Sequence, residues 1–307
     1  MTGQLVSVVI PTRNRATRVT AAIASVEQQT WPSWELIVVD DGSGDDTPAV
    51  LAAIAERNER VRVVRHDESQ GGSAARNHGI DVARGDVLAF LDDDDEWLPT
   101  KLAEQIEYLD AHPDVAAVSC WHAIDDGDPL GPALFRGPTS VTRRDLYWDN
   151  FLGSASFCML RRDAFVHEPR FDVTLPSAQD WDVWLQCATQ GRVAVVPQVL
   201  CRYSAHGDAR ITGSSPARID GRCRIIDRHS GAMSDDCRAY NHASVALIGV
   251  DSPSAEGKVL ASLVREGHAG AAWALTSAAI AGRLGDRVRD PARGARQLNR
   301  VIRRLDR

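Results

Sequence analysis

Over the first 120 residues, short runs of β-branched and other apolar residues alternate with segments whose apolar positions recur at helical spacing. Val19, Ile23 and Val26 repeat at intervals of three and four, and residues 102–109 show the same spacing. This order is typical of βα units that build a sheet of parallel strands. The apolar runs lack polar alternation, as expected when helices cover both faces of the sheet. The expected strands are 6–10, 36–39, 61–64, 87–91 and 115–120.

The pattern changes after residue 120. Residues 121–154 contain several Gly and Pro and predict a long irregular insertion, which in a compact domain is more often functional than idle. A strand at 156–160, a Trp-rich helix at about 180–190 and a strand pair within 193–203 follow. Beyond 215 only Ala-rich helical segments remain, at 239–247, 257–264 and 269–280. The sequence therefore predicts a first domain of residues 1–215 and a helical C-terminal domain of residues 216–307.

The composition is that of an ordinary globular protein. The 307 residues are 44% apolar and 25% charged, and 23 Gly and 14 Pro are too few for a disordered or fibrous chain. The net charge is -7, but residues 283–307 hold nine Arg against three acids, so residues 1–282 carry -13. Such an acidic body argues against general nucleic-acid binding.

Cysteine usage and apolar runs bear on the cellular compartment. The six cysteines include no C-x-x-C pair, and a chain of this length needs no disulfides, so we expect reduced and mostly buried thiols. The start of the sequence lacks a basic region and a long apolar run, and no stretch of about 18 apolar residues occurs. These features favour a cytoplasmic protein over a secreted or membrane-spanning one.

Polar residues directly follow four of the expected strands. In open α/β sheets, ligands bind beyond the carboxyl ends of the strands, so these positions are the first candidates for chemistry. They are residues 11–15, 40–43, 66–72 and 92–95. Three of the four segments carry carboxylates, which predicts an acidic rim at one edge of the sheet.

The strongest of these signals is the run Asp92-Asp93-Asp94-Asp95. Adjacent carboxylates raise one another's pKa unless a cation is present. Mg²⁺ and Mn²⁺ prefer oxygen ligands, and with one or two protein carboxylates they leave positions for a substrate phosphate. The alternative is a solvated acidic turn in which Asp95 caps a helix that has Pro99 in its first turn. The run by itself leaves both interpretations open.

Two further segments also have two interpretations. A carboxylate in Asp40-Asp41-Gly42-Ser43 can accept hydrogen bonds from a nucleotide base or ribose, or it can cap the next helix. Residues 71–77 begin with two glycines but match neither common phosphate-binding loop. Their expected use is to place Arg76, whose planar guanidinium suits phosphate or base recognition. The sequence shows no nucleophile elbow and no histidine pair spaced for zinc.

Five motifs occur along the chain: Pro11-Thr-Arg-Asn-Arg15, Val39-Asp-Asp-Gly-Ser43, Ser73-Ala-Ala-Arg-Asn-His-Gly-Ile80, Leu91-Asp-Asp-Asp-Asp-Glu-Trp-Leu-Pro99 and Gln179-Asp-Trp-Asp-Val-Trp184. In order and spacing they resemble family 2 glycosyltransferases over about residues 5–210. The resemblance implies an α/β nucleotide-diphospho-sugar transferase fold of type A, which is a Rossmann-like mixed sheet with helices on both faces, followed here by a C-terminal α-helical region. It also implies the inverting transfer of one sugar to an acceptor hydroxyl.

The resemblance implies a divalent metal, Mn²⁺ or Mg²⁺, at the D-x-D pair Asp92 and Asp94, with Asp94 as the direct ligand. Asp93 and Asp95 are expected nearer the ribose or the donor sugar. His206 belongs to a segment similar to the one that closes the family's active site, so it either contacts the metal or diphosphate or is an ordinary surface histidine. Arg210 is a weaker candidate for a phosphate contact. The expected donor-binding residues are Pro11, Thr12, Arg13, Asn14, Arg15, Asp41, Arg76, Asp92 and Asp93.

Asp180 matches the position of the family's catalytic base. Transfer requires a group that takes the proton of the acceptor hydroxyl, typically worth a factor of roughly 100 to 10,000 in rate. The family often has Glu-Asp here, and Gln179 replaces that Glu, so the sequence does not supply the usual acid directly before the base. The alternative is that Asp180 caps a helix whose core face is formed by Trp181, Trp184 and Leu185. The two roles are compatible.

The motifs favour a UDP-sugar donor, although dTDP- and GDP-sugars fit them as well. The acceptor hydroxyl could belong to a glycan, a lipid-linked sugar or a small molecule, in the synthesis of a polysaccharide, glycolipid or natural-product glycan. Residues 121–154 and the start of the helical C-terminal region are expected to flank the site. Trp121, Trp148 and Phe151 either stack on a sugar or an aglycone there or pack in the core.

Two other functions are compatible with parts of this pattern. A noncatalytic relative would bind nucleotide or glycan as a module, and the intact Asp92–Asp95 run and Asp180 argue against it. A nucleotidyltransferase with a similar sheet would need a glycine-rich basic loop after the first strand, where residues 11–15 contain no glycine.

The basic end of the chain is amphipathic, because Leu298, Val301, Ile302 and Leu305 share one face of an expected helix. Residues 283–307 could lie on anionic lipid and bring the enzyme to a lipid-linked acceptor at the inner face of the membrane. They could also pack on their own domain or form a homodimer contact. The sequence leaves these three uses open.

Overall fold

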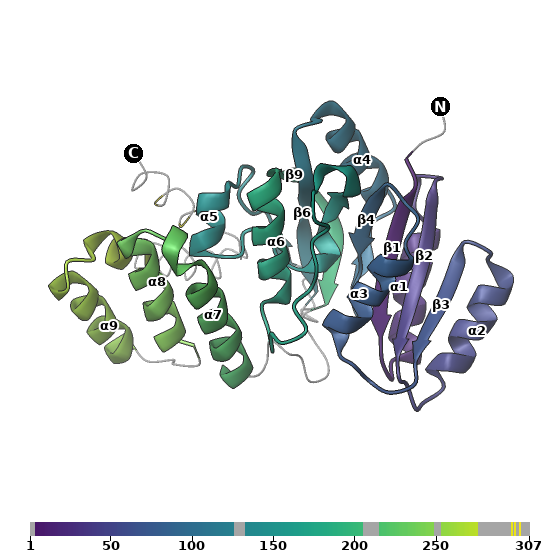
Figure 1. The fold of residues 1–307 in the computed structure, drawn as a ribbon, viewed down its shortest axis with the longest axis horizontal. Coiled ribbons are helices and arrows are strands. Elements are labelled where there is room, and N and C mark those ends of the chain that lie inside the picture. Colours follow the sequence, from purple (N-terminus) through teal and green to yellow (C-terminus); the bar gives the residue numbers. More distant parts are fainter. Residues whose placement is uncertain are drawn as a thin grey trace.

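The computed structural model describes residues 4–125, 133–204, 215–248 and 253–275, together with Arg296, Leu298 and Val301. These residues form one mixed sheet flanked by helices, with a group of further helices at the C-terminal side (Figure 1). The predicted α/β fold with a C-terminal helical region is confirmed. The strands are β1 (Val6–Thr12), β2 (Trp34–Asp41), β3 (Val61–His66), β4 (Val87–Phe90), β5 (Glu96–Trp97), β6 (Val115–Asp125), β7 (Ala133–Phe135), β8 (Met159–Arg161) and β9 (Arg192–Ser204).

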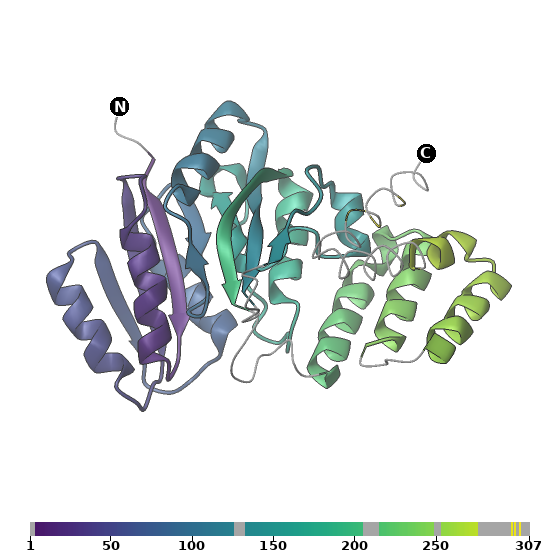
Figure 2. The ribbon, with the colours of Figure 1, turned by 180° about the vertical axis from the view of Figure 1, so that it is seen from behind.

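The first half of the sheet is parallel. Its strand order is β3-β2-β1-β4, so that β1 lies between β2 and β4, and every residue of β1 and β2 is buried. Helix α3 lies on one face of this half and α1 on the other (Figures 1 and 2). The helices that connect the strands of the sheet are α1 (Ala16–Glu27), α2 (Thr47–Arg57), α3 (Gly72–Val82), α4 (Lys101–Ala111), α5 (Arg143–Trp148) and α6 (Gln179–Gln190).

The second half of the sheet is mixed, in the order β4-β8-β6-β9-β5. Strand β8 runs antiparallel to β4 and β6, whereas β6 and β9 are parallel. The predicted strand at 156–160 is partly wrong, because residues 155–157 form a 3₁₀ turn before β8. The predicted strand pair within 193–203 is one strand, β9, which pairs with β6 along most of its length.

The prediction of an irregular insertion at 121–154 is wrong for much of its described part. Strand β6 continues to Asp125, and β7 and α5 follow. Helix α5 begins with a capping box, in which the Thr142 side chain accepts a hydrogen bond from the Asp145 N–H and the Asp145 carboxylate accepts one from the Thr142 N–H. This Thr-x-x-Asp pattern is a local signal for a helix start, so α5 was predictable from the sequence.

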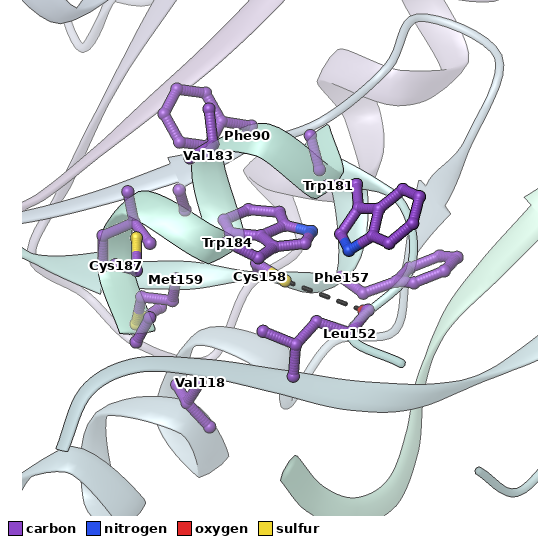
Figure 3. Close-up of a cluster of buried hydrophobic side chains, with 14 of the residues drawn as sticks. Phe90, Val118, Leu152, Phe157, Cys158, Met159, Trp181, Val183, Trp184 and Cys187 are labelled. Carbon is purple, nitrogen blue, oxygen red and sulfur yellow. Dashed lines mark hydrogen bonds between the residues drawn. The ribbon is translucent and has the colours of Figure 1, made fainter. Parts of the chain in front are cut away.

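Helix α6 is fixed by its tryptophans. Trp181 and Trp184 lie next to Phe157 and Cys158 (Figure 3), and both indoles are buried. The Trp181 indole donates a hydrogen bond to the Leu146 carbonyl at 2.7 Å, and the Trp184 indole donates one to the Gly153 carbonyl at 2.9 Å. The N-terminus of α6, which carries Asp180, is therefore held against residues 146–153.

Helices α7 (Ser215–His229), α8 (Asp235–Ala246) and α9 (Pro253–Arg265) follow the sheet and extend to one side of it (Figure 1). None of the helices in the described parts of the chain has the length and apolar character needed to cross a bilayer. Leu298 and Val301 are buried, which supports packing of these two positions on the chain itself. Ile302 and Leu305 lie outside the described residues. All six cysteines are free thiols and five are buried, as expected.

Candidate active site

A pocket of about 700 Å³ lies where β1, β2 and β4 end, and it extends past the N-terminus of α6 to residues 150–157. Its position beyond the carboxyl ends of parallel strands is the one expected for a ligand site in an open α/β sheet. Parallel pairing of β1 with both β2 and β4 brings these three strand ends together. The predicted residues that line it are Pro11, Thr12, Arg13, Arg15, Asp41, Arg76, Asp92, Asp93, Asp94 and Asp180.

Two basic residues balance the acidic run in this pocket. Arg76, from α3, forms an ion pair with Asp92. Arg15 contacts Asp93 at 2.7 Å and Asp94 at 3.1 Å. Burial raises the pKa of Asp93 above its usual value, although Arg15 and a hydrogen bond from Thr12 oppose the shift. The first three acids of the run therefore converge on one site together with cationic partners.

Asp95 differs from the three acids before it. It is only 1% exposed and does not line the pocket, and its carboxylate accepts a hydrogen bond from the Ser204 N–H at 3.1 Å. Burial and the nearby charge of Asp92 raise its pKa well above the usual value. The alternative in which Asp95 caps a helix is wrong, because α4 begins only at Lys101, after β5 and Pro99.

Asp41 lies at the pocket with its carboxylate surrounded by donors. Its oxygens accept hydrogen bonds from the Ser69 hydroxyl and from the N–H groups of Gln70 and Gly71, and one of them lies 2.8 Å from Nδ1 of His66. Burial by itself would raise the pKa of Asp41, but these hydrogen bonds lower it below the usual value. Asp41 thus fixes the loop that leads into α3 and does not cap α2.

The segment after β1 divides into two parts. Pro11, Thr12, Arg13 and Arg15 line the pocket. Asn14 does not line it; it has φ 53°, and its side chain accepts a hydrogen bond from the Gly44 N–H at 2.8 Å. Asn14 therefore joins the loops that follow β1 and β2, and its predicted contact with the donor stays a prediction.

Asp180 lies in the first turn of α6 and lines the pocket. It does not cap the helix, because the capping position is Ala178, which has the left-handed φ of 61°. Burial raises the pKa of Asp180 to about 6, with a further contribution from Asp92, while Arg76 opposes the shift. Gln179 also lines the pocket and donates a hydrogen bond to the Leu175 carbonyl.

The structure adds residues that the sequence analysis did not select. The Ser154 hydroxyl donates a hydrogen bond to Asp92 at 3.2 Å, and the Ser156 hydroxyl accepts one from the Asp92 N–H at 3.0 Å. His122, Phe157 and Tyr203 form an aromatic part of the pocket wall. The serines lie more than 60 residues from Asp92, so no local pattern indicated these contacts.

The three aromatic residues that were expected to stack on a sugar do not line the pocket. Trp148 and Phe151 are buried in the hydrophobic core, and Trp148 packs beside Tyr240. Trp121 is partly buried and is not among the residues that line the pocket. His206 and Arg210 lie outside the described residues.

The acids of the pocket suit a metal ion that takes only one or two ligands from the protein and the others from a bound phosphate or water. Within the described residues, no group of three or more His, Cys, Asp or Glu side chains forms a complete metal site. Asp92 and Asp94 line the pocket with side chains that are 27% and 17% exposed, and buried Asp95 adds a third negative charge nearby. One or two carboxylates beside an open cavity fit Mg²⁺ or Mn²⁺ that is shared with a phosphate ligand.

The chain is similar to known sugar-transferring proteins. Residues 7–167 match the model of the family described as Glycosyl transferase family 2. The chain is 29% identical over 245 residues to the putative colanic acid biosynthesis glycosyl transferase WcaA of Escherichia coli. This match covers 77% of this chain and 85% of WcaA. It is 26% identical to the E. coli enzyme WfgD, a UDP-Glc:α-D-GlcNAc-diphosphoundecaprenol β-1,3-glucosyltransferase, over 64% of this chain and 74% of WfgD.

A solved structure supports the fold over almost the whole chain. The mannosyltransferase PcManGT from Pyrobaculum calidifontis, in complex with GDP-Man and Mn²⁺, has a TM-score of 0.60 and 20% identity, and the match covers 99% of this chain and 88% of PcManGT. This likeness shows the fold, and the family match rests on the sequence. The chain belongs to glycosyl transferase family 2 and is a glycosyltransferase.

Proposed function

We propose that this glycosyltransferase moves a sugar from a nucleotide-diphosphate sugar, with a UDP-sugar as the first candidate, to an acceptor hydroxyl with inversion and with a divalent metal. The observation that carries the proposal is that Asp180 and the Asp92–Asp94 run line one pocket. Arg76 lies within electrostatic reach of Asp92, Asp93 and Asp180. A base and a cation-binding group are therefore available at the same cavity.

The end of the pocket next to β1 and β2 suits the nucleoside diphosphate. Thr12, Arg13 and Asp41 supply polar groups for the base and ribose, as the family resemblance implies. Arg15 and Arg76 supply two cations for the negative charge of the diphosphate. The donors of the two similar proteins, UDP-Glc for WfgD and GDP-Man for PcManGT, support this class of ligand.

Asp92 and Asp94 would hold the metal, with Asp94 as the direct ligand. When bound, a divalent ion stabilises the negative charge that develops on the leaving diphosphate. Mn²⁺ is the first candidate because PcManGT contains it, and Mg²⁺ has the same preference for oxygen ligands.

Asp180 serves as the base in the transfer. The acceptor oxygen forms a bond to the anomeric carbon of the donor sugar, the bond from that carbon to the diphosphate oxygen breaks, and the hydroxyl proton passes to the Asp180 carboxylate. Its pKa of about 6 keeps most of the group ionised at neutral pH and makes it a stronger base than an ordinary carboxylate. One displacement with one base inverts the anomeric configuration.

We further propose a role in polysaccharide or glycolipid synthesis at the cytoplasmic side, with residues 1–215 as the catalytic domain and residues 216–307 as a helical domain. WcaA is named for colanic acid biosynthesis, and the acceptor of WfgD is linked to undecaprenol through a diphosphate. The nine Arg of residues 283–307 offer positive charge that suits such a lipid-linked acceptor or an anionic membrane surface.

The test is nucleoside diphosphate release from a panel of UDP-, dTDP- and GDP-sugars with Mn²⁺, for the wild type and for Asp94→Ala. We expect release from at least one donor and a loss of about 100-fold or more in the variant or with a chelator. Asp163→Ala is the matched control, because the Asp163 side chain is 75% exposed and lies outside the pocket. Absence of release from every donor contradicts the proposed function, and full activity of Asp94→Ala contradicts the metal role.

A further inference from the structure

Helix α7 lies beside α6, although the predicted domain boundary assigns it to the C-terminal helical domain (Figures 1 and 2). Four of its residues share one face of the helix, because they follow one another at intervals of four, three and four: Ala217, Gly221, Arg224 and Arg228. Each of them contacts either the segment that leads into α6 or the first turn of α6. Helix α7 therefore runs along the stretch of chain that carries Asp180.

The closest approach between the two segments is at Gly221. A Cβ atom at this position would lie 2.3 Å from Oγ of Ser177 and 2.6 Å from the Ser177 carbonyl oxygen, so the Ser177 hydroxyl occupies the space that a larger residue would need. This hydroxyl donates a hydrogen bond to the Ala217 carbonyl at 2.8 Å. Ser177 is only 4% exposed and lines the pocket. The backbone of α7 thus packs directly on a residue of the pocket wall, and it does so because residue 221 is glycine.

The residue after Ser177 has a strained backbone. Ala178 has φ 61° and ψ 22°, in the left-handed region that is unfavourable for a residue with a Cβ atom. Such a conformation persists only where the surrounding structure holds it. Ala178 lines the pocket, and its carbonyl accepts a hydrogen bond from the Asp182 N–H at 3.1 Å. Its backbone therefore sets the direction in which α6 begins, and Asp180 lies two residues further on.

The last turn of α7 makes a different kind of contact. Arg228 forms ion pairs with Asp182 at 2.6 Å and with Asp172. Asp182 is 1% exposed, so loss of this pair is expected to destabilise the fold. The pair can be removed while the contact between Gly221 and Ser177 stays, which provides a control.

We propose that α7 positions the catalytic base. The contact of Gly221 with Ser177 holds Ala178 in its left-handed conformation. That conformation directs Asp180 into the pocket, so Gly221 and Ser177 are positioning residues that act through Asp180. This inference rests on the proposed function, in which Asp180 is the base. It extends the catalytic unit to a helix beyond residues 7–167, the part of the chain that matches the family model.

The first experiment compares Gly221→Ala with Arg228→Met in the full chain, by nucleoside diphosphate release from the donor that the wild type uses. Both variants should lower Tm by several degrees, the first through overpacking and the second through loss of a buried ion pair. Only Gly221→Ala is expected to lower kcat, by about tenfold or more, because it displaces the base. The KM for the donor should change less than twofold in both variants. Equal losses of kcat, or a loss in Gly221→Ala that comes from donor KM alone, would overturn the proposal.

Two further variants test the steps between α7 and the base. Glycine adopts the left-handed conformation without strain, so adding Ala178→Gly to Gly221→Ala should restore kcat by about threefold or more. No recovery would show that the backbone of residue 178 does not carry the effect. Ser177→Ala removes the hydrogen bond to the Ala217 carbonyl without overpacking and should lower kcat about threefold. This variant decides the question if Gly221→Ala does not fold, and a wild-type kcat would then contradict the proposal.

Hydrogen exchange measured by mass spectrometry tests the same contact without catalysis. In Gly221→Ala, peptides that cover the start of α6 and include the Asp182 N–H should exchange about tenfold faster than in the wild type, whereas peptides of α3 should not change. Unchanged exchange at the start of α6 would mean that α7 does not hold this segment. If the wild type releases no nucleoside diphosphate from any donor, the proposed function fails, and the exchange experiment still decides whether the contact at Gly221 fixes the start of α6.

Discussion

Arg76 of α3 is ion-paired with Asp92, the first acid of the run that is expected to hold the metal. Arg15 likewise forms ion pairs with Asp93 at 2.7 Å and with Asp94 at 3.1 Å. In this arrangement the arginines act as counterions for the pocket. A metal that binds alone must displace them and leave their charges without partners, whereas the diphosphate of the donor offers them new ones.

Metal and nucleotide should therefore bind cooperatively. We expect Mn²⁺ alone to bind weakly and UDP to tighten its binding by at least tenfold, which corresponds to a coupling free energy of about 1.4 kcal/mol or more. Electron paramagnetic resonance of free Mn²⁺, titrated with and without UDP, measures both affinities. Arg76→Met should bind Mn²⁺ alone more tightly than the wild type does and gain less from UDP. Equal Mn²⁺ affinities with and without UDP would refute this coupling.

Two aspartates that lie two positions apart on α6 should respond in opposite ways to the same substitution. Asp180→Asn removes the base and should lower kcat by roughly 100- to 10,000-fold. It should also stabilise the fold by on the order of 1–2 kcal/mol at neutral pH, because burial raises the pKa of Asp180 and makes its ionised form unfavourable. Activity assays and thermal unfolding without ligands test both effects.

Asp182→Asn is the matched control. Asp182 is 1% exposed and is held by Arg228 at 2.6 Å and by Gln186 at 2.8 Å. Burial tends to raise the pKa of Asp182, but its partners lower it below the usual value, so its charge stabilises the native state. Asp182→Asn should lower stability by about 1–3 kcal/mol and keep kcat within about threefold. Loss of kcat in both variants alike would show that Asp180 has no special catalytic role.

The activity should fall on the acid side of pH 6. The base must be ionised, so kcat/KM is expected to rise about tenfold per pH unit below the pKa of about 6 and to level off above it. Asp180 also lowers the free energy of unfolding over a related pH range. The loss begins near pH 3.8, the usual pKa of an aspartate, grows up to about pH 6 and is complete above it. The gain in Tm of Asp180→Asn should therefore be larger at pH 7.5 than at pH 4.5. A pH-independent gain would mean that the substitution acts through packing instead.

Local sequence patterns were sufficient for the parallel half of the fold. The apolar runs at 6–10 and 36–39 end in polar residues, and the structure confirms strands there with Thr12 and Asp41 at the pocket. Long-range pairing accounts for what was missed. Strand β6 extends past Cys120 because β9 pairs with it as far as Asp125, and a partner about 80 residues away leaves no local signal.

In the candidate site, too, the residues were predictable from local motifs, whereas their contacts depend on long-range packing. The acidic run and Arg76 were identified from motifs, but their ion pair requires α3 to pack on β1, the strand that pairs with β4. The alternative of Asp180 as a helix cap could not be decided from spacing, because the left-handed backbone of Ala178 places the cap of α6 two residues before Asp180. Ser154 reaches Asp92 only because β8 pairs with β4 directly after the serine-rich turn.

The packing of α3 on β1 gives a last prediction that links the fold to the donor site. A Cβ atom at Gly79 would lie 2.3 Å from Cγ1 of Val9, so alanine there must push the helix away from the strand. Such overpacking typically costs about 1–3 kcal/mol. The same shift moves Arg76, one turn earlier on α3, away from the pocket. Gly79→Ala should therefore lower Tm by several degrees and raise the KM for the donor.

Two further variants establish the cause. Gly231→Ala should melt with the wild type, because no atom lies within 4 Å of a Cβ at that position. Val9→Ala removes the methyl groups that alanine at Gly79 would meet, so the double variant should be destabilised by less than the sum of the two single changes. Additive losses would mean that the two residues do not meet in solution, and that the position of Arg76 depends on something other than this contact.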